Sequence, residues 1–244
     1  GLHFNENEDQ VITSYPLNIE NEEISECSLC YYDSSGENSH PFVIGEKNWP
    51  NGGIGYGYNP KPWFKFGWGD GEVSDSIMID GSNYYDSWFY VVGVLSYSSS
   101  FARLYINGEL KGEKTSGNFN FKVNDEIIIG YSWGVHHWKG IIASAYIYSR
   151  TLTEDEIYNN YINEEPVNKT GLVLYLAPWS IDPILGWWYD ISGHSNHGKI
   201  YYAQVSEEKA KGLTIVPGND AYPCNEWKFY RDYTESQYPH EHYF

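Results

Sequence analysis

The sequence of 244 residues predicts an all-β protein with one short helix. Residues 88–95 carry apolar side chains at both alternating sets of positions, which is typical of a strand covered on both faces. The dipeptide Asn107-Gly108 separates two further runs of strand-forming residues. Both residues accept a positive φ, so they predict a two-residue hairpin turn between antiparallel strands.

The one expected helix begins after Thr153. Thr153 and Glu156 have the spacing of a capping box, in which each side chain accepts a hydrogen bond from the backbone N–H of the other residue. The apolar side chains that follow are expected to share one helical face: Ile157, Tyr158, Tyr161 and Ile162. No other segment predicts a helix, so the expected fold class is all-β.

The composition agrees with a large β domain and narrows the range of partners. Aromatic residues make up 18% of the chain, with 24 Tyr and 10 Trp, and such residues favour the half-buried surfaces of sheets. The formal net charge is −18, from 15 basic and 33 acidic residues. This charge argues against nucleic acid and anionic membranes as partners, because both are negatively charged. No apolar run is long enough to predict membrane insertion.

Three cysteines give no disulfide framework. Cys27 and Cys30 lie in a predicted strand over residues 24–32, where side chains three positions apart point to opposite faces. Since no second cysteine pair completes a zinc site, both are expected to be small buried residues. A disulfide between Cys224 and one of them is left open.

Two features bear on the location of the protein. The chain starts at Gly1 without an initiator methionine, so either a processed N-terminus or a piece of a longer protein is expected. Asn168, in the sequence Asn-Lys-Thr, is a candidate glycosylation acceptor in a predicted linker. An accessible acceptor would suit an extracellular protein or one of the cell or virion surface.

Several segments of residues 1–163 resemble the laminin G-like, concanavalin A-like lectin/glucanase family of jelly rolls. Gly1-Leu2-His3-Phe4, followed by Asp9 and Val11, is similar to the strand "L-x-F-x-G-x-D-D-Y-V" of this family. Further similarity lies in residues 88–94, 104–110, 129–130, 140–143 and 148–157. The resemblance implies an antiparallel jelly-roll β-sandwich with one short helix at its C-terminal end.

Pieces that normally precede the opening strand in this family are found in the second half of the chain. Residues 171–176 form a predicted strand, and residues 190–200 resemble the family's "D-x-S-G-N-x-N-H-G" segment. Residues 212–215 also align weakly with residues 1–4 as an internal repeat. The family's usual order of segments is therefore rearranged.

This rearrangement predicts how the chain is divided. We expect a concanavalin A-like jelly roll in residues 1–165 and an extension in residues 166–244 that completes the same sandwich in permuted order. Two alternatives are the beginning of a second, truncated jelly roll and a strand that completes a neighbouring subunit.

The sequence predicts that the protein is not an enzyme. Glycoside hydrolases that resemble this architecture carry Glu-x-Asp-x-x-Glu on one strand face, which supplies a nucleophile and an acid. This chain has no such pattern, and it lacks Gly-x-Ser-x-Gly, a phosphate-binding loop and His-Glu-x-x-His.

Aromatic residues in predicted loops and strands are the candidates for carbohydrate binding. Flat aromatic rings can stack on sugar rings, and imidazoles can hydrogen-bond to hydroxyl groups. The candidates are Trp49, Trp63, Trp133, His136, His137 and Trp138. For the tryptophans beside the two histidines, the alternative is a structural role as loop anchors.

Asp70 and Asp75 are candidate calcium ligands. Both lie in a loop-like context, and calcium prefers oxygen ligands. Their spacing fits no defined calcium-binding loop. Calcium is the one cofactor that the sequence suggests.

These features lead to three hypotheses about function. The first is a non-catalytic extracellular or virion-surface β-sandwich that recognises glycans or surface glycoproteins, as a lectin-like adhesion module. The second is a structural subunit of a capsid, spike or filament, assembled as a homo-oligomer through its jelly roll and C-terminal strand. The third is a glycoside hydrolase with an unfamiliar site. The aromatic loops favour the first, and the rearranged C-terminal pieces favour the second.

Overall fold

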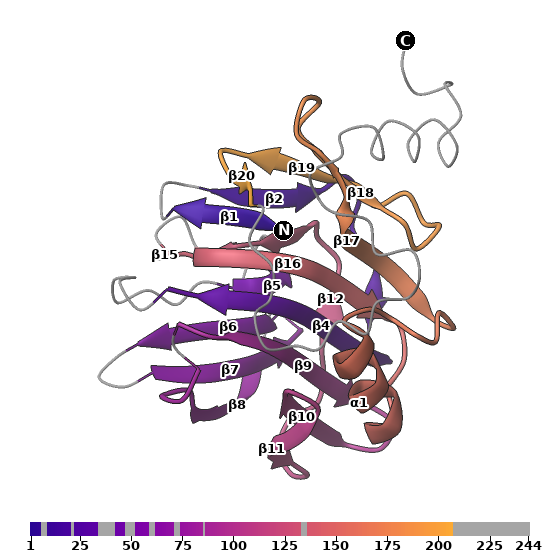
Figure 1. Ribbon diagram of the computed structural model, residues 1–244. Helices are drawn as coiled ribbons and strands as arrows, with labels where there is room; N and C mark the ends of the chain where they lie inside the picture. The colour runs from indigo at the N-terminus through magenta and orange to yellow at the C-terminus, as the bar shows by residue number, and fades with distance from the viewer. Residues whose placement is uncertain are drawn as a thin grey trace.

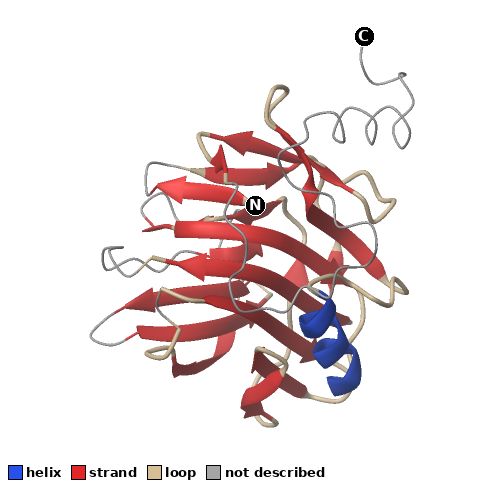
Figure 2. Cartoon of the chain, in the orientation of Figure 1, coloured by secondary structure: helices blue, strands red, loops and turns tan. Residues whose placement is uncertain are grey.

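The computed structural model describes residues 1–5, 9–20, 22–33, 42–46, 52–58, 62–70, 74–84, 86–132 and 136–206. Residues 42, 43, 46, 57, 58, 132 and 136 are described by their backbone alone. Strands dominate this part of the chain, and a single short helix accompanies them (Figure 2). The all-β prediction is confirmed. In the described ranges no helix is long and apolar enough to cross a membrane.

One layer of the fold is an antiparallel sheet with a strand buried on both faces at its centre. Its order is β11 (Glu109–Lys114), β10 (Phe101–Ile106), β9 (Trp88–Ser96), β4 (Glu23–Tyr32), β16 (Lys139–Tyr148) and β17 (Leu172–Asp182) (Figure 1). β1 (Leu2–Asn5) pairs with the beginning of β16, and β20 (Gln204–Val205) pairs with β1. After its first residue β9 is buried throughout, as its apolar pattern predicts.

The Asn107-Gly108 turn joins β10 to β11. Both residues have positive φ, at 54° and 79°, and the two strands pair antiparallel. This confirms the predicted hairpin. Asn107 adds a further contact, because its Oδ1 accepts a hydrogen bond of 2.8 Å from the backbone N–H of Tyr90.

The second layer continues from β17 through the strands on the other side of the core. Its order is β18 (Trp187–Asp190), β19 (Gly198–Tyr201), β2 (Gln10–Thr13), β13 (Ile127–Ile129), β5 (Phe42–Glu46), β6 (Gly52–Tyr58), β7 (Pro62–Gly69) and β8 (Ser74–Asp80). Two small pairs complete the described strands: β3 (Ile19–Glu20) with β12 (Lys122–Val123), and β14 (Tyr131–Ser132) with β15 (His136–His137).

The two layers pack closely on an inner core. β17 passes from one layer to the other, because it pairs with β16 near its start and with β18 at its end. Gly93 of β9 lies directly against Phe66 of β7, and a Cβ atom at Gly93 would sit 2.4 Å from that ring. A larger residue at this position would force the layers apart.

The two cysteines of β4 lie on opposite sides of the first layer. Cys30 belongs to the inner core between the layers, whereas Cys27 belongs to a second cluster on the outer face. Both are fully buried and unbonded, which agrees with their predicted role. Burial raises the pKa of both thiols, so neither is a ready thiolate. Cys224 lies outside the described residues.

Helix α1 (Glu154–Asn163) covers the outer cluster, which is rich in tyrosine. Beneath it, the hydroxyl of Tyr146 donates a hydrogen bond of 2.7 Å to that of Tyr90. The predicted helical face is only partly correct: Ile157 is buried together with Asn160, but Tyr158 is 55% exposed. At 100° per residue, positions 157 and 160 face the sheet while 158 turns toward solvent.

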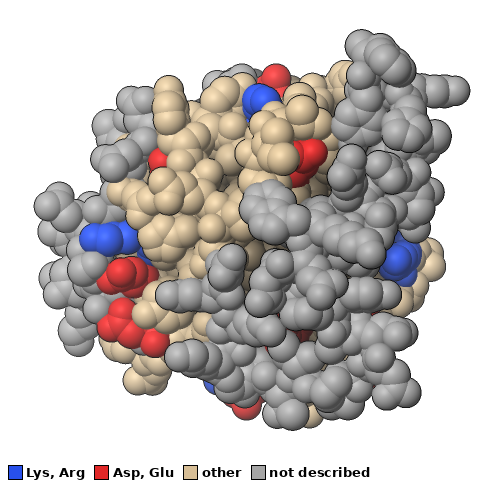
Figure 3. Space-filling model, turned by 45° about the horizontal axis from the view of Figure 1, so that its top comes forward, with Lys and Arg blue, Asp and Glu red and all other residues tan. Residues whose placement is uncertain are grey.

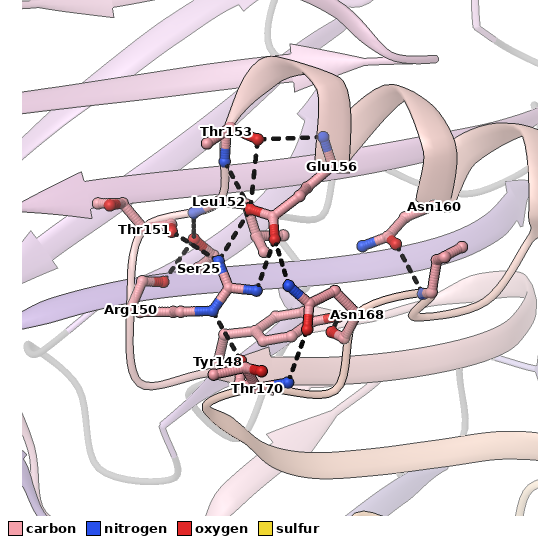
Figure 4. Close-up of polar contacts among 11 residues, drawn as sticks. Ser25, Tyr148, Arg150, Thr151, Leu152, Thr153, Glu156, Asn160, Asn168 and Thr170 are labelled. Carbon is pink, nitrogen blue, oxygen red and sulfur yellow. Dashed lines mark hydrogen bonds and ion pairs between the residues drawn. The ribbon is translucent and has the colours of Figure 1, made fainter.

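A polar junction holds the start of the helix against the segments that follow β16 and precede β17 (Figure 4). The predicted capping box is present: Thr153 Oγ1 accepts from the N–H of Glu156, and the Glu156 carboxylate accepts from the N–H of Thr153. Arg150 donates to both Glu156 oxygens, at 2.8 and 2.9 Å. The hydrogen bonds from Arg150 are the main reason that the pKa of Glu156 falls to about 2.

Glu156→Gln is expected to lower the free energy of unfolding by about 1–2 kcal/mol at pH 7, since the paired charge is only partly shielded from water. The folded-state pKa of about 2 lies below the ordinary 4.5. The stabilisation is therefore complete above about pH 4.5 and is lost as the pH falls toward 2. Urea unfolding of both proteins at pH 7 and near pH 2 measures this difference.

Glu154 provides the control, because its side chain is 66% exposed. At pH 7, Glu154→Gln should lower the free energy of unfolding less than Glu156→Gln does. If the free energies of unfolding of wild type and Glu156→Gln differed equally at both pH values, the ion-pair explanation would be contradicted.

Residues 172–205 take part in both layers of the same chain. β17 pairs with β16, β19 pairs with β2, and β20 pairs with β1. The segments that resemble early family strands therefore lie beside strands of residues 1–165 (Figure 1). Residues 207–244, with the repeat-like residues 212–215, lie outside the described residues. The division into residues 1–165 and 166–244 stays a prediction.

Candidate functional site

Trp138 is part of the inner core, not of a sugar-binding loop. It is 0% exposed, and its ring meets the Tyr32 ring edge-on at 5.0 Å. Its Nε1–H donates a hydrogen bond of 3.2 Å to the carbonyl of Tyr31. The prediction that Trp138 offers a sugar platform is therefore wrong, because both faces of its ring are covered by protein.

His137 lies at the end of a short hairpin formed by β14 and β15. Its half-buried ring packs against Tyr131, with the ring centres 4.9 Å apart. Burial raises the pKa of the nearby Asp9 carboxyl group. The backbone hydrogen bond from Asn5 and the proximity of His137 lower this pKa, but by less. His136 is described by its backbone alone, and Trp133 lies outside the described residues. For these three residues, sugar binding stays a prediction.

Trp63 remains a candidate platform. It stands on β7 between Gly57 of β6 and Asp80 of β8, and it is half-buried. Trp49 lies outside the described residues.

The two predicted calcium ligands have protein partners. Asp75 forms an ion pair with Lys114. Burial alone would raise the pKa of Asp75, but the hydrogen bonds from Lys114 and from the N–H of Ser76 outweigh it, so the pKa is lowered. Asp70 accepts a hydrogen bond of 3.4 Å from Asn120. In the described part of the chain, no three His, Cys, Asp or Glu side chains are grouped to hold a metal. Calcium binding stays a prediction.

Asn168, the candidate glycosylation acceptor, is exposed and belongs to the polar junction at the helix (Figure 4). Its Nδ2 donates a hydrogen bond of 2.8 Å to Glu156. Its Oδ1 accepts one of 3.0 Å from the N–H of Thr170. Glycosylation at this position stays a prediction.

A group of exposed apolar and aromatic side chains lies elsewhere, beginning at the turn between β17 and β18. Asp182 shapes this turn, because its Oδ1 accepts hydrogen bonds of 2.9 Å from the N–H groups of Ile184 and Leu185. Its carbonyl also accepts one from Gly186. The turn leaves Ile184 83% exposed and Leu185 43% exposed. Such large apolar side chains at a rigid turn are unusual in a solvated loop.

The strands that follow extend this group over the outer face of the second layer. Trp188 points into the core and is 0% exposed, so its neighbour Trp187 points outward. Trp187 is half-buried and pairs with Lys199 of β19, whose Nζ lies over the indole ring, 4.8 Å from its centre. Tyr201 shares the face of Lys199 and is 41% exposed.

The loop between β18 and β19 is held by one buried carboxylate. Asp190 is 2% exposed and accepts hydrogen bonds from the N–H groups of Tyr175, Ser192 and Asn196. Its own N–H donates to Nδ1 of His197 at 3.0 Å. The loop therefore has a structural role that positions the two strands.

We call this group the β18–β19 surface; it comprises Ile184, Leu185, Trp187, Lys199 and Tyr201. Sequence reasoning missed it. The adjacent Trp187 and Trp188 indicated that one ring points outward, but not which one. Figure 3 turns the top of Figure 1 forward; most of the described surface on this face belongs to residues other than Lys, Arg, Asp and Glu.

Comparisons with known proteins bear on the family and on the fold. A family model described as the concanavalin A-like lectin/glucanases superfamily matches residues 5–158. Among curated proteins, none matches the sequence.

Two solved structures have a similar fold. A protein of Bacteroides ovatus inferred to bind carbohydrate is 16% identical, with a TM-score of 0.66, over 84% of this chain and 58% of its own. The heptameric SAP-like pentraxin of Limulus polyphemus is 13% identical, with a TM-score of 0.52, over 66% of this chain and 80% of its own.

At these identities the two structures show the fold alone. This chain also spans less than two thirds of the Bacteroides protein. The family model covers more than half of the chain, and the layers and strand order agree with a jelly-roll sandwich. The chain belongs to the concanavalin A-like lectin/glucanase superfamily.

Proposed function

We propose that this protein is a non-catalytic glycan-recognition domain of an extracellular, cell or virion surface, and that it binds sugar on the β18–β19 surface. The observation that carries the proposal is the placement of Trp187. Its indole lies on the outer face of a strand, while the next residue, Trp188, is locked in the core by a hydrogen bond of 2.7 Å from its Nε1 to Ala177. The platform is therefore rigid before any ligand binds.

The chemistry of the surface suits a sugar. One side of a pyranose ring is an apolar C–H face that can lie on an aromatic ring, and its rim carries hydroxyl groups. Trp187 and Tyr201 supply aromatic rings. The Nζ of Lys199 donates one hydrogen bond, of 2.9 Å, to the carbonyl of Leu185, and an ammonium group has three donors, so it can also donate to a ligand. Gln10 of β2, which pairs with Tyr201, adds an amide at the margin. An apolar site with a few polar groups is typical of small-ligand recognition.

The carboxylates near the surface support binding without catalysis. A retaining glycosidase needs two carboxyl groups about 5–5.5 Å apart that are available to the substrate. Asp182 and Asp190 instead accept backbone hydrogen bonds that shape the turn and the loop. The absence of Glu-x-Asp-x-x-Glu from the sequence points the same way.

The assembly hypothesis has less support. It requires the strand at residues 171–176 to pair with another subunit, whereas β17 pairs with β16 of its own chain. The likeness to a Bacteroides protein inferred to bind carbohydrate supports the glycan hypothesis instead.

A glycan array probed with the whole chain, in calcium and in EDTA, tests the proposal. We expect binding to at least one glycan class, and Trp187→Ala should weaken it about fivefold or more, since a stacked ring contributes roughly 1 kcal/mol or more. Tyr158→Ala is the matched control, because Tyr158 is an exposed aromatic residue on α1. Loss of binding in EDTA would support the calcium prediction.

Two results would contradict the proposal, the first in its function and the second in its site. One is a wild-type protein that binds no glycan in either buffer. The other is a Trp187→Ala protein that binds as tightly as wild type, while Trp63→Ala, at the remaining predicted platform, abolishes binding. In that second case glycan recognition stands and the site moves to β7.

A further inference from the structure

Tyr202 occupies a strained turn at the end of the β18–β19 surface. Its φ is +61°, and the N–H of Ala203 donates a hydrogen bond of 2.8 Å to the carbonyl of Tyr201. A bond that spans only three residues around a central positive φ defines a rare and strained kind of γ-turn. A bulky aromatic residue adopts this conformation only at an energetic cost.

The chain places more tolerant residues at comparable positions. The other described non-glycine residues with positive φ are Asn18, Asp86, Ser100, Asn107, Glu164 and Ser195. Asparagine and aspartate accept this conformation readily, and the remaining three are not aromatic. Tyr202 is the one aromatic residue of this described group, although Asn or Gly would fit the turn with less strain.

Packing of the Tyr202 ring does not offset the strain. The side chain is 70% exposed, so little apolar area is removed from water. The backbone around it is nevertheless held in place, because Ala203 packs against the inner core and β20 pairs with β1. The turn therefore presents an exposed ring from a fixed position.

We infer that Tyr202 is a ligand contact of the β18–β19 surface, and that the chain retains it at a cost in stability because its ring binds sugar. This inference rests on the proposed function. Tyr201, the last residue of β19, shares its face with Lys199 beside Trp187, and the γ-turn that follows places the backbone of Tyr202 next to this end of the surface. A strained residue whose side chain stays 70% exposed is typical of a functional site.

Tyr202→Asn, introduced into the whole 244-residue chain, tests both halves of this inference. Asparagine accepts the positive φ but removes the ring, so the thermal midpoint should rise by about 2–4 °C. Affinity for the best glycan of the wild-type array should fall about fivefold or more. Tyr158→Asn is the matched control, since it removes a ring that is 55% exposed from a regular helix. It should leave the affinity unchanged and should not raise the midpoint.

The outcomes separate the two proposals. If wild type binds a glycan and Tyr202→Asn binds it equally well, Tyr202 is not a contact, while the proposed function stands. A lower midpoint for Tyr202→Asn would also overturn the inference, because the ring would then stabilise the fold. If wild type binds no glycan at all, the proposed function fails and the role of Tyr202 fails with it.

Discussion

Trp138→Ala is expected to lower the free energy of unfolding by about 3–5 kcal/mol. Trp138 is 0% exposed, and it packs against Tyr32, Tyr56 and Phe89 in the inner core. The substitution leaves a large cavity and removes the donor that pairs with the carbonyl of Tyr31. Urea unfolding followed by circular dichroism measures the loss.

Trp63→Ala is the matched control for this experiment. Trp63 is half-buried on β7, so Trp63→Ala should lower the free energy of unfolding by less than half as much as Trp138→Ala. Equal costs for the two substitutions would contradict the assignment of Trp138 to the core. Trp138→Ala should change glycan binding only in proportion to the unfolded fraction, because its ring is not accessible to a ligand.

A chain that ends at residue 165 is expected not to fold. It lacks β17 to β20 and with them several fully buried side chains of the inner core: Leu174, Leu176, Ile181 and Trp188. Each contributes about 2–5 kcal/mol, and together they match or exceed the roughly 5–15 kcal/mol that stabilises an ordinary domain. Removal of β17 also leaves one side of the second half of β16, residues 145–148, unpaired, which favours aggregation.

A complementation experiment, in which the missing segment is supplied as a separate peptide, tests this prediction further. Adding a separate peptide of residues 166–244 should restore cooperative unfolding if the strands only need to be present. The same peptide with Leu176→Asp should fail, because an unpaired charge would be buried in the core. A folded, cooperatively unfolding monomer of residues 1–165 would contradict the prediction and would support strand exchange between subunits.

Local features were the best predicted from the sequence. The Asn107-Gly108 turn and the Thr153–Glu156 capping box both have the expected geometry, because each depends on residues only a few positions apart. Cys27 and Cys30 were separated by strand alternation alone. The helix face was predicted less well, since Tyr158 turns away from the sheet.

The proposed binding site was not predicted from the sequence. Trp138 was among the predicted platforms, whereas Trp187 was not. One is buried and the other lies on an outer face, a difference that depends on which layer each strand joins. Tyr202 carries no sequence signal, because its left-handed conformation follows from the pairing of β19 with β2 and of β20 with β1.

The sequence by itself determined the all-β class, the hairpin, the helix cap and the resemblance that the family model supports, because short-range patterning and motif order encode them. Only the tertiary structure decided that residues 172–205 pair within their own chain, and which aromatic rings reach solvent. These depend on strand pairs distant in sequence, such as β19 with β2. Alternation along a strand separates its two faces, but the partner layer alone decides which face is covered.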